Sequence, residues 1–137
     1  MLPPATALYA ALLGLLYVRL SLRVIRHRRS SKIAIGTTGD VHLERAARVH
    51  GNFAEYVPLG LVLIYSVEAT GYPWWAIHPF GLLLLAGRLL HAHGVSQERE
   101  DFSYRVAGMV CTFLTLLSTA GLVLFAFART AFRAVIM

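Results

Sequence analysis

Charged residues are scarce in this chain. Only 15% of its 137 residues are Asp, Glu, Lys or Arg, whereas soluble globular domains carry about 25%. In their place, 57% of the residues are hydrophobic, and the mean hydropathy is +0.61. This balance excludes an ordinary soluble domain and predicts an integral membrane protein.

Cysteine is nearly absent as well. The single Cys111 excludes an intrachain disulfide, and its apolar neighbours predict a packed thiol rather than a nucleophile. The sequence has no Gly-rich phosphate loop, and the spacings of His42, His50, His91 and His93 match no metal-binding pattern. We therefore expect no metal.

Positive charge exceeds negative charge, with 13 Lys and Arg against 7 Asp and Glu. A nucleic-acid-binding surface is one explanation of such an excess. However, six of the cations lie between Arg19 and Lys32, at the end of an apolar segment, and such a cluster is typical of a membrane surface. We therefore expect membrane lipids, and no nucleic acid, as partners.

Four apolar segments are each near the roughly 20 residues that cross a bilayer. The segment Thr70–Pro73 is expected to end the second helix and form the turn to the third. Asp40 is expected to cap the N-terminus of the second helix. We expect one domain, residues 1–137, that folds as an all-α bundle of four transmembrane helices. The predicted spans are residues 4–23, 41–69, 74–93 and 102–128.

Basic residues are unequally distributed between the two sides of such a bundle. Four spans place both termini on one side and the first and third connections on the other. The positive-inside rule then predicts cytoplasmic connections and both termini outside. A plasma (inner) membrane is expected, because residues 133–137 contain no retention signal. No basic residue precedes the first apolar segment, so a retained helix is expected rather than a cleaved signal peptide. The side of the connections carries Arg23, Arg26, Arg28, Arg29, Lys32 and Arg99, and the side of the termini carries Arg129 and Arg133.

The second segment begins with a row of polar side chains. Their spacing of i, i+4, i+8 and i+11 places them along one stripe of a helix. The predicted topology brings Arg88, His91 and Arg105 to the same depth of the membrane. Ionisable groups at such a depth indicate a functional site by default, although they also form purely structural ion pairs between helices. The stripe consists of Glu44, Arg48, Asn52 and Glu55.

These residue types suit a small ligand that carries both carboxylates and an ammonium group. Arginine binds a carboxylate through two parallel hydrogen bonds, a glutamate accepts from an ammonium group, and an asparagine both donates to and accepts from a peptide. A short charged peptide meets this description. A cation channel is less compatible, because such pores favour rings of acidic residues.

The same stretch resembles the signature of the MAPEG family, the membrane-associated proteins of eicosanoid and glutathione metabolism. Residues 44–58 read Glu-Arg-Ala-Ala-Arg-Val-His-Gly-Asn-Phe-Ala-Glu-Tyr-Val-Pro, and the family pattern is Glu-Arg, an Arg three residues on, then Asn-x-x-Glu-Tyr-x-Pro. The similarity extends over nearly the whole chain and includes an Arg-x-x-His near the end of the third helix, here Arg88 and His91.

The resemblance implies a homotrimer that binds glutathione between adjacent subunits, near the cytoplasmic side. It implies a membrane-bound transferase or peroxidase in which Arg105 holds the glutathione sulfur as a thiolate that attacks a lipophilic substrate. Glutathione would be the cosubstrate. The residues that match the glutathione-binding positions of the family are Arg48, His50, Asn52, Glu55, Tyr56, Arg88 and His91.

Two alternatives stay open at the level of the sequence. The first is a non-catalytic lipid-binding or scaffold member of the same fold. The second concerns Arg88, which either contacts the ligand or forms an ion pair with Glu55 or Glu44. The chain also departs from the eicosanoid-forming enzymes one turn after His91, where it has Val95 instead of a tyrosine.

Overall fold

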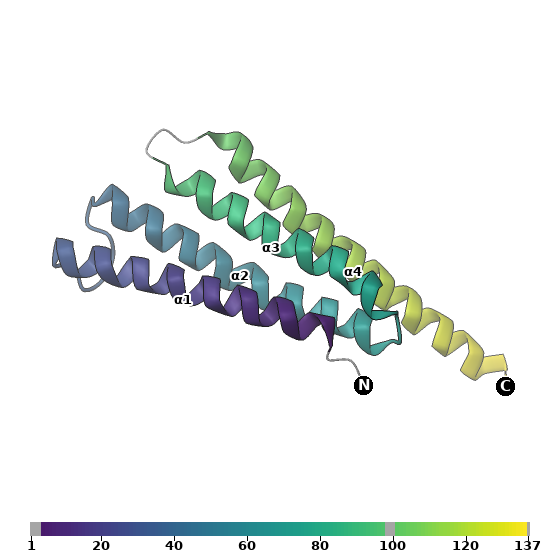
Figure 1. Cartoon of the computed structure of the whole chain (residues 1–137). Helices are drawn as coiled ribbons and strands as arrows, with labels where there is room; N and C mark the ends of the chain where they lie inside the picture. The colour runs from purple at the N-terminus through teal and green to yellow at the C-terminus, as the bar shows by residue number, and fades with distance from the viewer. Residues whose placement is uncertain (1–3, 98–100, 137) are drawn as a thin grey trace.

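A computed structural model of the chain describes residues 4–97 and 101–136, and within these ranges α-helix is the only regular secondary structure (Figure 1). Arg99, one of the cations expected on the cytoplasmic side, lies outside the described residues. The helices are α1 (Ala5–Ser31), α2 (Val41–Ala69), α3 (Trp74–Ser96) and α4 (Phe102–Ile136).

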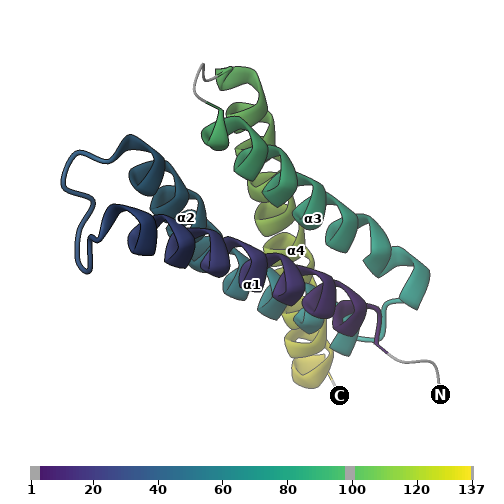
Figure 2. The ribbon, with the colours of Figure 1, turned by 60° about the vertical axis from the view of Figure 1, so that its left-hand side comes forward.

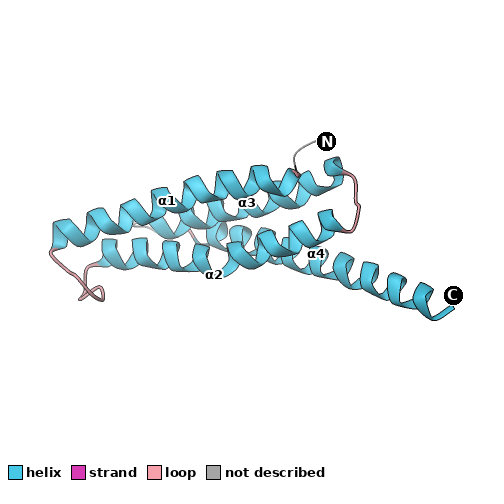
Figure 3. Ribbon diagram, turned by 90° about the horizontal axis from the view of Figure 1, so that it is seen from below, coloured by secondary structure: helices cyan, strands magenta, loops and turns pink. Residues whose placement is uncertain are grey.

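The helices run alternately up and down the bundle. The start of α1 and the end of α4 therefore lie at one end of the bundle, together with the α2–α3 turn (Figures 1 and 2). The α1–α2 and α3–α4 connections lie at the other end of the bundle. The C-terminal part of α4 extends beyond the other three helices (Figure 3). We call the end with the α1–α2 and α3–α4 connections the connection end, and the opposite end the terminal end.

Helix α1 is longer than the span predicted for it. It continues through Ser31 and ends at Lys32, which adopts a left-handed conformation (φ 55°) and donates its backbone N–H to the carbonyl of Arg28. Arginine is a good helix former, and Arg28 and Arg29 in the last turn complement the negative end of the helix dipole. The cations predicted to follow the helix therefore lie partly on it.

The start of α2 has the predicted cap. The Asp40 carboxylate accepts the backbone N–H of Leu43 at 2.9 Å and the hydroxyl of Ser31 at the end of α1. The Ser31 hydrogen bond and then the Leu43 hydrogen bond stabilise the ionised carboxylate and lower the pKa of Asp40. One side chain thus caps α2 and ties it to the end of α1.

The core lies between α1, α2 and α3. Leu13, Ile64 and Leu84 are fully buried there, one from each helix. Tyr9 packs so closely over α3 that a Cβ added to Gly81 would lie 2.1 Å from its ring. Glycine at this position lets the aromatic ring of α1 fill the space against α3.

Helices α3 and α4 approach closely through glycines. A Cβ added to Gly108 would lie 2.6 Å from the backbone oxygen of Gly87 and 2.6 Å from the backbone nitrogen of His91. Small residues commonly allow such contacts between membrane helices. The buried threonines of α4 direct their hydroxyls to their own helix, as Thr112 does to the carbonyl of Gly108 at 2.8 Å.

The outer surface is apolar. Helices α1 and α4 are each long and apolar enough to cross a membrane, and only 17% of the apolar window of each is buried within the protein. Their remaining apolar side chains face outward, as expected of helices in contact with lipid. Among these, Leu117 and Phe127 are 73% and 74% exposed.

Candidate functional site

A pocket of about 660 Å³ lies at the connection end of the bundle, between the N-terminal half of α2, the end of α3 and the start of α4. We call it the mixed-charge pocket, because arginines and glutamates line it together. Its charged and polar lining residues are Glu44, Arg45, Arg48, Asn52, Glu55, His91 and Arg105, and its other lining residues are Val41, Ala47, Gly51 and Val95.

The α2 wall of the pocket is the polar stripe that the spacing predicts. All four members line the pocket. The other face of the same helix carries Leu43, Val49, Phe53 and Val57, which are buried. This helical periodicity anchors α2 through its apolar face and leaves the stripe pointing into the pocket.

Arg88 lies behind this wall rather than in it. Its side chain is only 1% exposed, and one terminal nitrogen donates to Oδ1 of Asn52 at 2.6 Å while the other donates to Oγ1 of Thr112 at 2.7 Å. Its Nε has no hydrogen-bond partner among the described residues. Of the two roles left open for Arg88, the ion pair with Glu55 or Glu44 is not among its described contacts, and ligand contact stays a prediction. Its hydrogen bond holds Asn52 in place.

Arg105 reaches the pocket from α4, where the resemblance expects it. A Cβ added to Gly94 would lie 2.9 Å from the backbone nitrogen of Arg105, so the end of α3 and the first turn of α4 touch through their backbones. This contact brings Arg105 to the same pocket as His91. The predicted layer of polar groups from α2, α3 and α4 therefore forms at one depth.

Besides Arg88, two further predicted binding residues do not line this pocket. His50 points toward α1, where its Nε2 lies 3.1 Å from the hydroxyl of Ser21 and its ring stacks on Tyr17 at 4.8 Å. Tyr56 lies between α2 and α4, next to Phe113, with the Arg88 guanidinium 5.6 Å from its ring centre. Within one subunit, the structure separates both side chains from the other predicted ligand contacts.

Arg45 lines the pocket although the motif alone does not single it out as a site residue. Its guanidinium donates to the backbone carbonyls of Val95 at 3.1 Å and Gln97 at 2.6 Å. A cation that binds the last carbonyls of a helix stabilises that helix end. The Glu-Arg pair that opens the motif, Glu44-Arg45, is a signal for this position, but its partner on α3 is visible only in the fold.

The charges of the mixed-charge pocket suit a small molecule with groups of both signs. Three arginines and two glutamates line it, together with one amide and one imidazole. Glu44, Arg48, Glu55 and Arg105 are exposed at the surface of the subunit, so the pocket is open to a ligand. Among the described residues, no group of three or more His, Cys, Asp or Glu side chains is arranged to hold a metal ion.

Comparison with known proteins identifies the family of the chain. The model of the MAPEG family matches residues 6–125, which include parts of all four helices. The chain belongs to the MAPEG family. This membership and the two apolar helices make it a membrane protein with a helical-bundle fold.

Two bacterial relatives are similar to the chain over most of its length. It is 40% identical over 112 residues to the protein named "Inner membrane protein YecN" of Escherichia coli strain K12, and the match covers 82% of this chain and 84% of that protein. The protein of the same name from Escherichia coli O6:H1 matches to the same extent. Both names describe a location and no reaction.

Proposed function

We propose that this MAPEG protein is a membrane-bound, glutathione-dependent transferase or peroxidase that directs a thiolate toward lipophilic electrophiles. The observation that carries the proposal is the mixed-charge pocket, in which Arg48, Asn52, Glu55, His91 and Arg105 line one space from three helices. Family membership supports a role in glutathione or eicosanoid metabolism.

The pocket residues divide into groups that match the parts of the tripeptide. Arg48 binds a carboxylate, Glu55 accepts hydrogen bonds from the ammonium group, and Asn52 pairs with a peptide group. Arg88 holds Asn52 in place through a charged hydrogen bond of 2.6 Å. His50 and Tyr56, which lie away from this pocket, complete a site only if a neighbouring subunit supplies another wall, as in the proposed homotrimer.

Arg105 supplies the chemistry. A fixed guanidinium beside the sulfur stabilises the thiolate relative to the thiol, whose unperturbed pKa is ~8.5. The thiol proton leaves to water. In the transferase reaction the thiolate then forms a carbon–sulfur bond as the electrophile loses its leaving group. In the peroxidase reaction two glutathione molecules become a disulfide while a hydroperoxide becomes an alcohol and water.

The proposed location is an inner membrane, as in the name of the E. coli relative. The basic residues of α1 favour a cytoplasmic connection end, where glutathione has access to the mixed-charge pocket. Both termini then lie outside. The lipophilic substrate reaches the pocket laterally from the bilayer.

Calorimetry of the detergent-solubilised protein with glutathione tests binding. We expect saturable heat that is lost when Asn52 and Glu55 are both replaced by alanine. The matched control is Arg29→Ala, which removes an exposed charge from the last turn of α1 outside the pocket. No heat, and no competition by glutathione analogues, would favour the non-catalytic lipid-binding alternative and refute the proposal.

Conjugation of glutathione to a simple aromatic electrophile tests catalysis. Arg105→Ala should lower kcat/KM by about 100-fold or more, the loss typical for removal of one charge-stabilising group, while the oligomer stays intact by size-exclusion chromatography. Unchanged turnover in this variant would remove Arg105 from the mechanism.

A further inference from the structure

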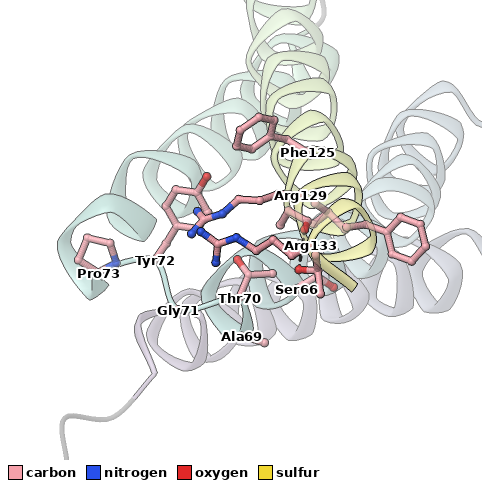
Figure 4. Close-up of a pocket in the computed structure, with 13 residues that line it drawn as sticks. Ser66, Ala69, Thr70, Gly71, Tyr72, Pro73, Phe125, Arg129 and Arg133 are labelled. Carbon is pink, nitrogen blue, oxygen red and sulfur yellow. Dashed lines mark hydrogen bonds between the residues drawn. The ribbon is translucent and has the colours of Figure 1, made fainter. Parts of the chain in front are cut away.

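A second cavity, of about 800 Å³, lies at the terminal end of the bundle (Figure 4). It is bounded by the end of α2, the α2–α3 turn and the C-terminal part of α4. We call it the arginine pocket, because Arg129 and Arg133 are its charged lining residues. The glutathione proposal gives it no role.

Arg129 and Arg133 line the same cavity. They lie four residues apart on α4 and therefore on one face of the helix. Figure 4 shows both guanidinium groups extending from α4 toward Tyr72 and Thr70 at the α2–α3 turn. Among the described residues, neither Arg129 nor Arg133 has a hydrogen bond or an ion pair.

No carboxylate side chain among the described residues is available to neutralise them. The sequence has no Asp or Glu after Asp101. Glu68 is the acidic residue of α2 near this end, and its two carboxylate oxygens accept the backbone N–H groups of Ala5 at 2.6 Å and Thr6 at 3.0 Å. Both oxygens of Glu68 are therefore hydrogen-bonded to the start of α1. Within the described part of the chain, no acidic side chain forms an ion pair with Arg129 or Arg133.

The other polar groups also define the ligand. The aliphatic hydroxyls of the lining already donate to backbone carbonyls three or four residues earlier in the chain, at 2.7 to 2.9 Å. The side-chain donors that remain are the two guanidiniums and the hydroxyl of Tyr72. Such a set selects an anion that only accepts hydrogen bonds, and a phosphate group is one. The hydroxyls that already donate to backbone carbonyls are those of Ser66, Thr70 and Thr130.

The surroundings indicate where that phosphate comes from. The pocket lies where the uncharged stretch of α4 ends, and Phe125 and Phe127 beside it are 62% and 74% exposed. Trp74 and Trp75, also largely exposed, begin α3 directly after the turn, and exposed Trp residues are typical of the membrane–water interface. The exposed apolar surface of α4 therefore lies directly beside Arg129 and Arg133.

We propose that the arginine pocket binds the headgroup of an anionic phospholipid. The phosphate lies between Arg129 and Arg133 and accepts from Tyr72, while the acyl chains follow the apolar surface of α4. A basic recess beside membrane helices is a recognised way to bind anionic lipids. This inference does not depend on the proposed glutathione chemistry.

Native mass spectrometry of the detergent-solubilised protein tests it, with phosphatidylglycerol as the probe and zwitterionic phosphatidylcholine for comparison. We expect the intact protein to retain phosphatidylglycerol in preference to phosphatidylcholine. The double variant Arg129→Gln, Arg133→Gln should retain at least about fivefold less phosphatidylglycerol, since each arginine contributes a charged hydrogen bond. The charge-matched control, Arg26→Gln with Arg29→Gln, removes two exposed cations of the basic cluster and should lower retention much less, because neither residue lines the arginine pocket.

The remaining outcomes separate the sources of the phosphate. Equal loss of lipid in the two double variants, or equal retention of the two lipids, would overturn the proposal. So would displacement of phosphatidylglycerol by millimolar inorganic phosphate, since it would show a site for a soluble anion. Glutathione calorimetry on the Arg129, Arg133 variant should be unchanged, which keeps failure of this inference distinct from failure of the proposed function.

Discussion

The two pockets lie at opposite ends of the bundle and differ in charge. The mixed-charge pocket has three arginines and two glutamates, whereas the charged side chains of the arginine pocket are two arginines. A site with both signs selects a ligand with both signs, and a site with cations alone selects an anion. One small bundle thus has chemically different pockets at its two ends.

The pockets also differ in how they are built. Behind the mixed-charge pocket, α3 and α4 touch through Gly87, Gly94 and Gly108, and Arg88 is buried between them. The arginine pocket is formed by an exposed turn and by the part of α4 that extends past the other helices (Figure 3). Changes near the first pocket should therefore disturb packing and binding together, and changes near the second should affect binding alone.

The largest effect is expected where α3 and α4 touch. Gly108→Ala adds a Cβ that meets backbone atoms of Gly87 and His91 at 2.6 Å, so the helices must separate. Thermal unfolding in detergent should show a loss of ~1–3 kcal/mol, as in other overpacked interiors, together with weaker glutathione binding. The matched control is Gly121→Ala, where an added Cβ has no neighbour within 4 Å. Equal stability of the two variants would contradict the close contact.

A separate effect on binding is expected at Arg88. Arg88→Met keeps most of the volume of the side chain and removes the charged hydrogen bond to Asn52, whose distance is 2.6 Å. Charged hydrogen bonds contribute ~1.5–3 kcal/mol, so glutathione affinity should fall by about tenfold or more. The thermal midpoint should fall as well, because the change also removes the hydrogen bond from Arg88 to Oγ1 of Thr112 on α4, so the two affinities are compared well below the midpoint of the variant. Unchanged affinity would show that Asn52 needs no support from Arg88.

The charge preference of the mixed-charge pocket rests on Glu55. Glu55→Gln should weaken glutathione binding by about tenfold, because an amide replaces the carboxylate that faces the ammonium group. A deaminated glutathione analogue should bind the variant and the original protein equally in calorimetry. If the variant loses affinity for both ligands to the same extent, Glu55 does not bind the ammonium group.

The smallest effect is expected at Asp40, near the mixed-charge pocket. Its pKa is lowered in the folded state, chiefly by the Ser31 hydroxyl. The stabilisation is therefore complete above the unfolded-state pKa of ~3.9, and it is lost as the pH falls through the lower folded-state pKa. Hydrogen exchange at the start of α2 should accelerate in this acidic range. Asp40→Asn, which keeps a capping oxygen but does not titrate, should not show the change.

Part of the site is predictable because it is local. The spacing of Glu44, Arg48, Asn52 and Glu55 needs only the helical period, and all four line one pocket. The Asp40 cap needs only the residue type and the start of an apolar helix, and its hydrogen bond to the backbone of α2 is present. The MAPEG motif identifies the family, which the match over residues 6–125 confirms.

The rest depends on contacts between distant segments. No periodicity of α2 alone shows that His50 meets Ser21 of α1, or that Arg45 binds the last carbonyls of α3. The resemblance associates Arg88 with the ligand through the Arg-x-x-His match, and the predicted topology places it at the depth of the stripe. Depth does not show whether a side chain points into a pocket or behind its wall, and the hydrogen bonds of Arg88 to Asn52 and to α4 show the second.

Composition, helical periodicity and the motif are properties of short stretches, so the sequence alone identifies a helical membrane protein of the MAPEG family with one polar helix face. Which polar groups line the same pocket depends on how the helices pack against one another. The approach of α3 and α4 through glycine places Arg88 behind Asn52, and the α2–α3 turn places Tyr72 beside Arg129 and Arg133. These arrangements depend on how closely helices pack, and no single helix contains that information.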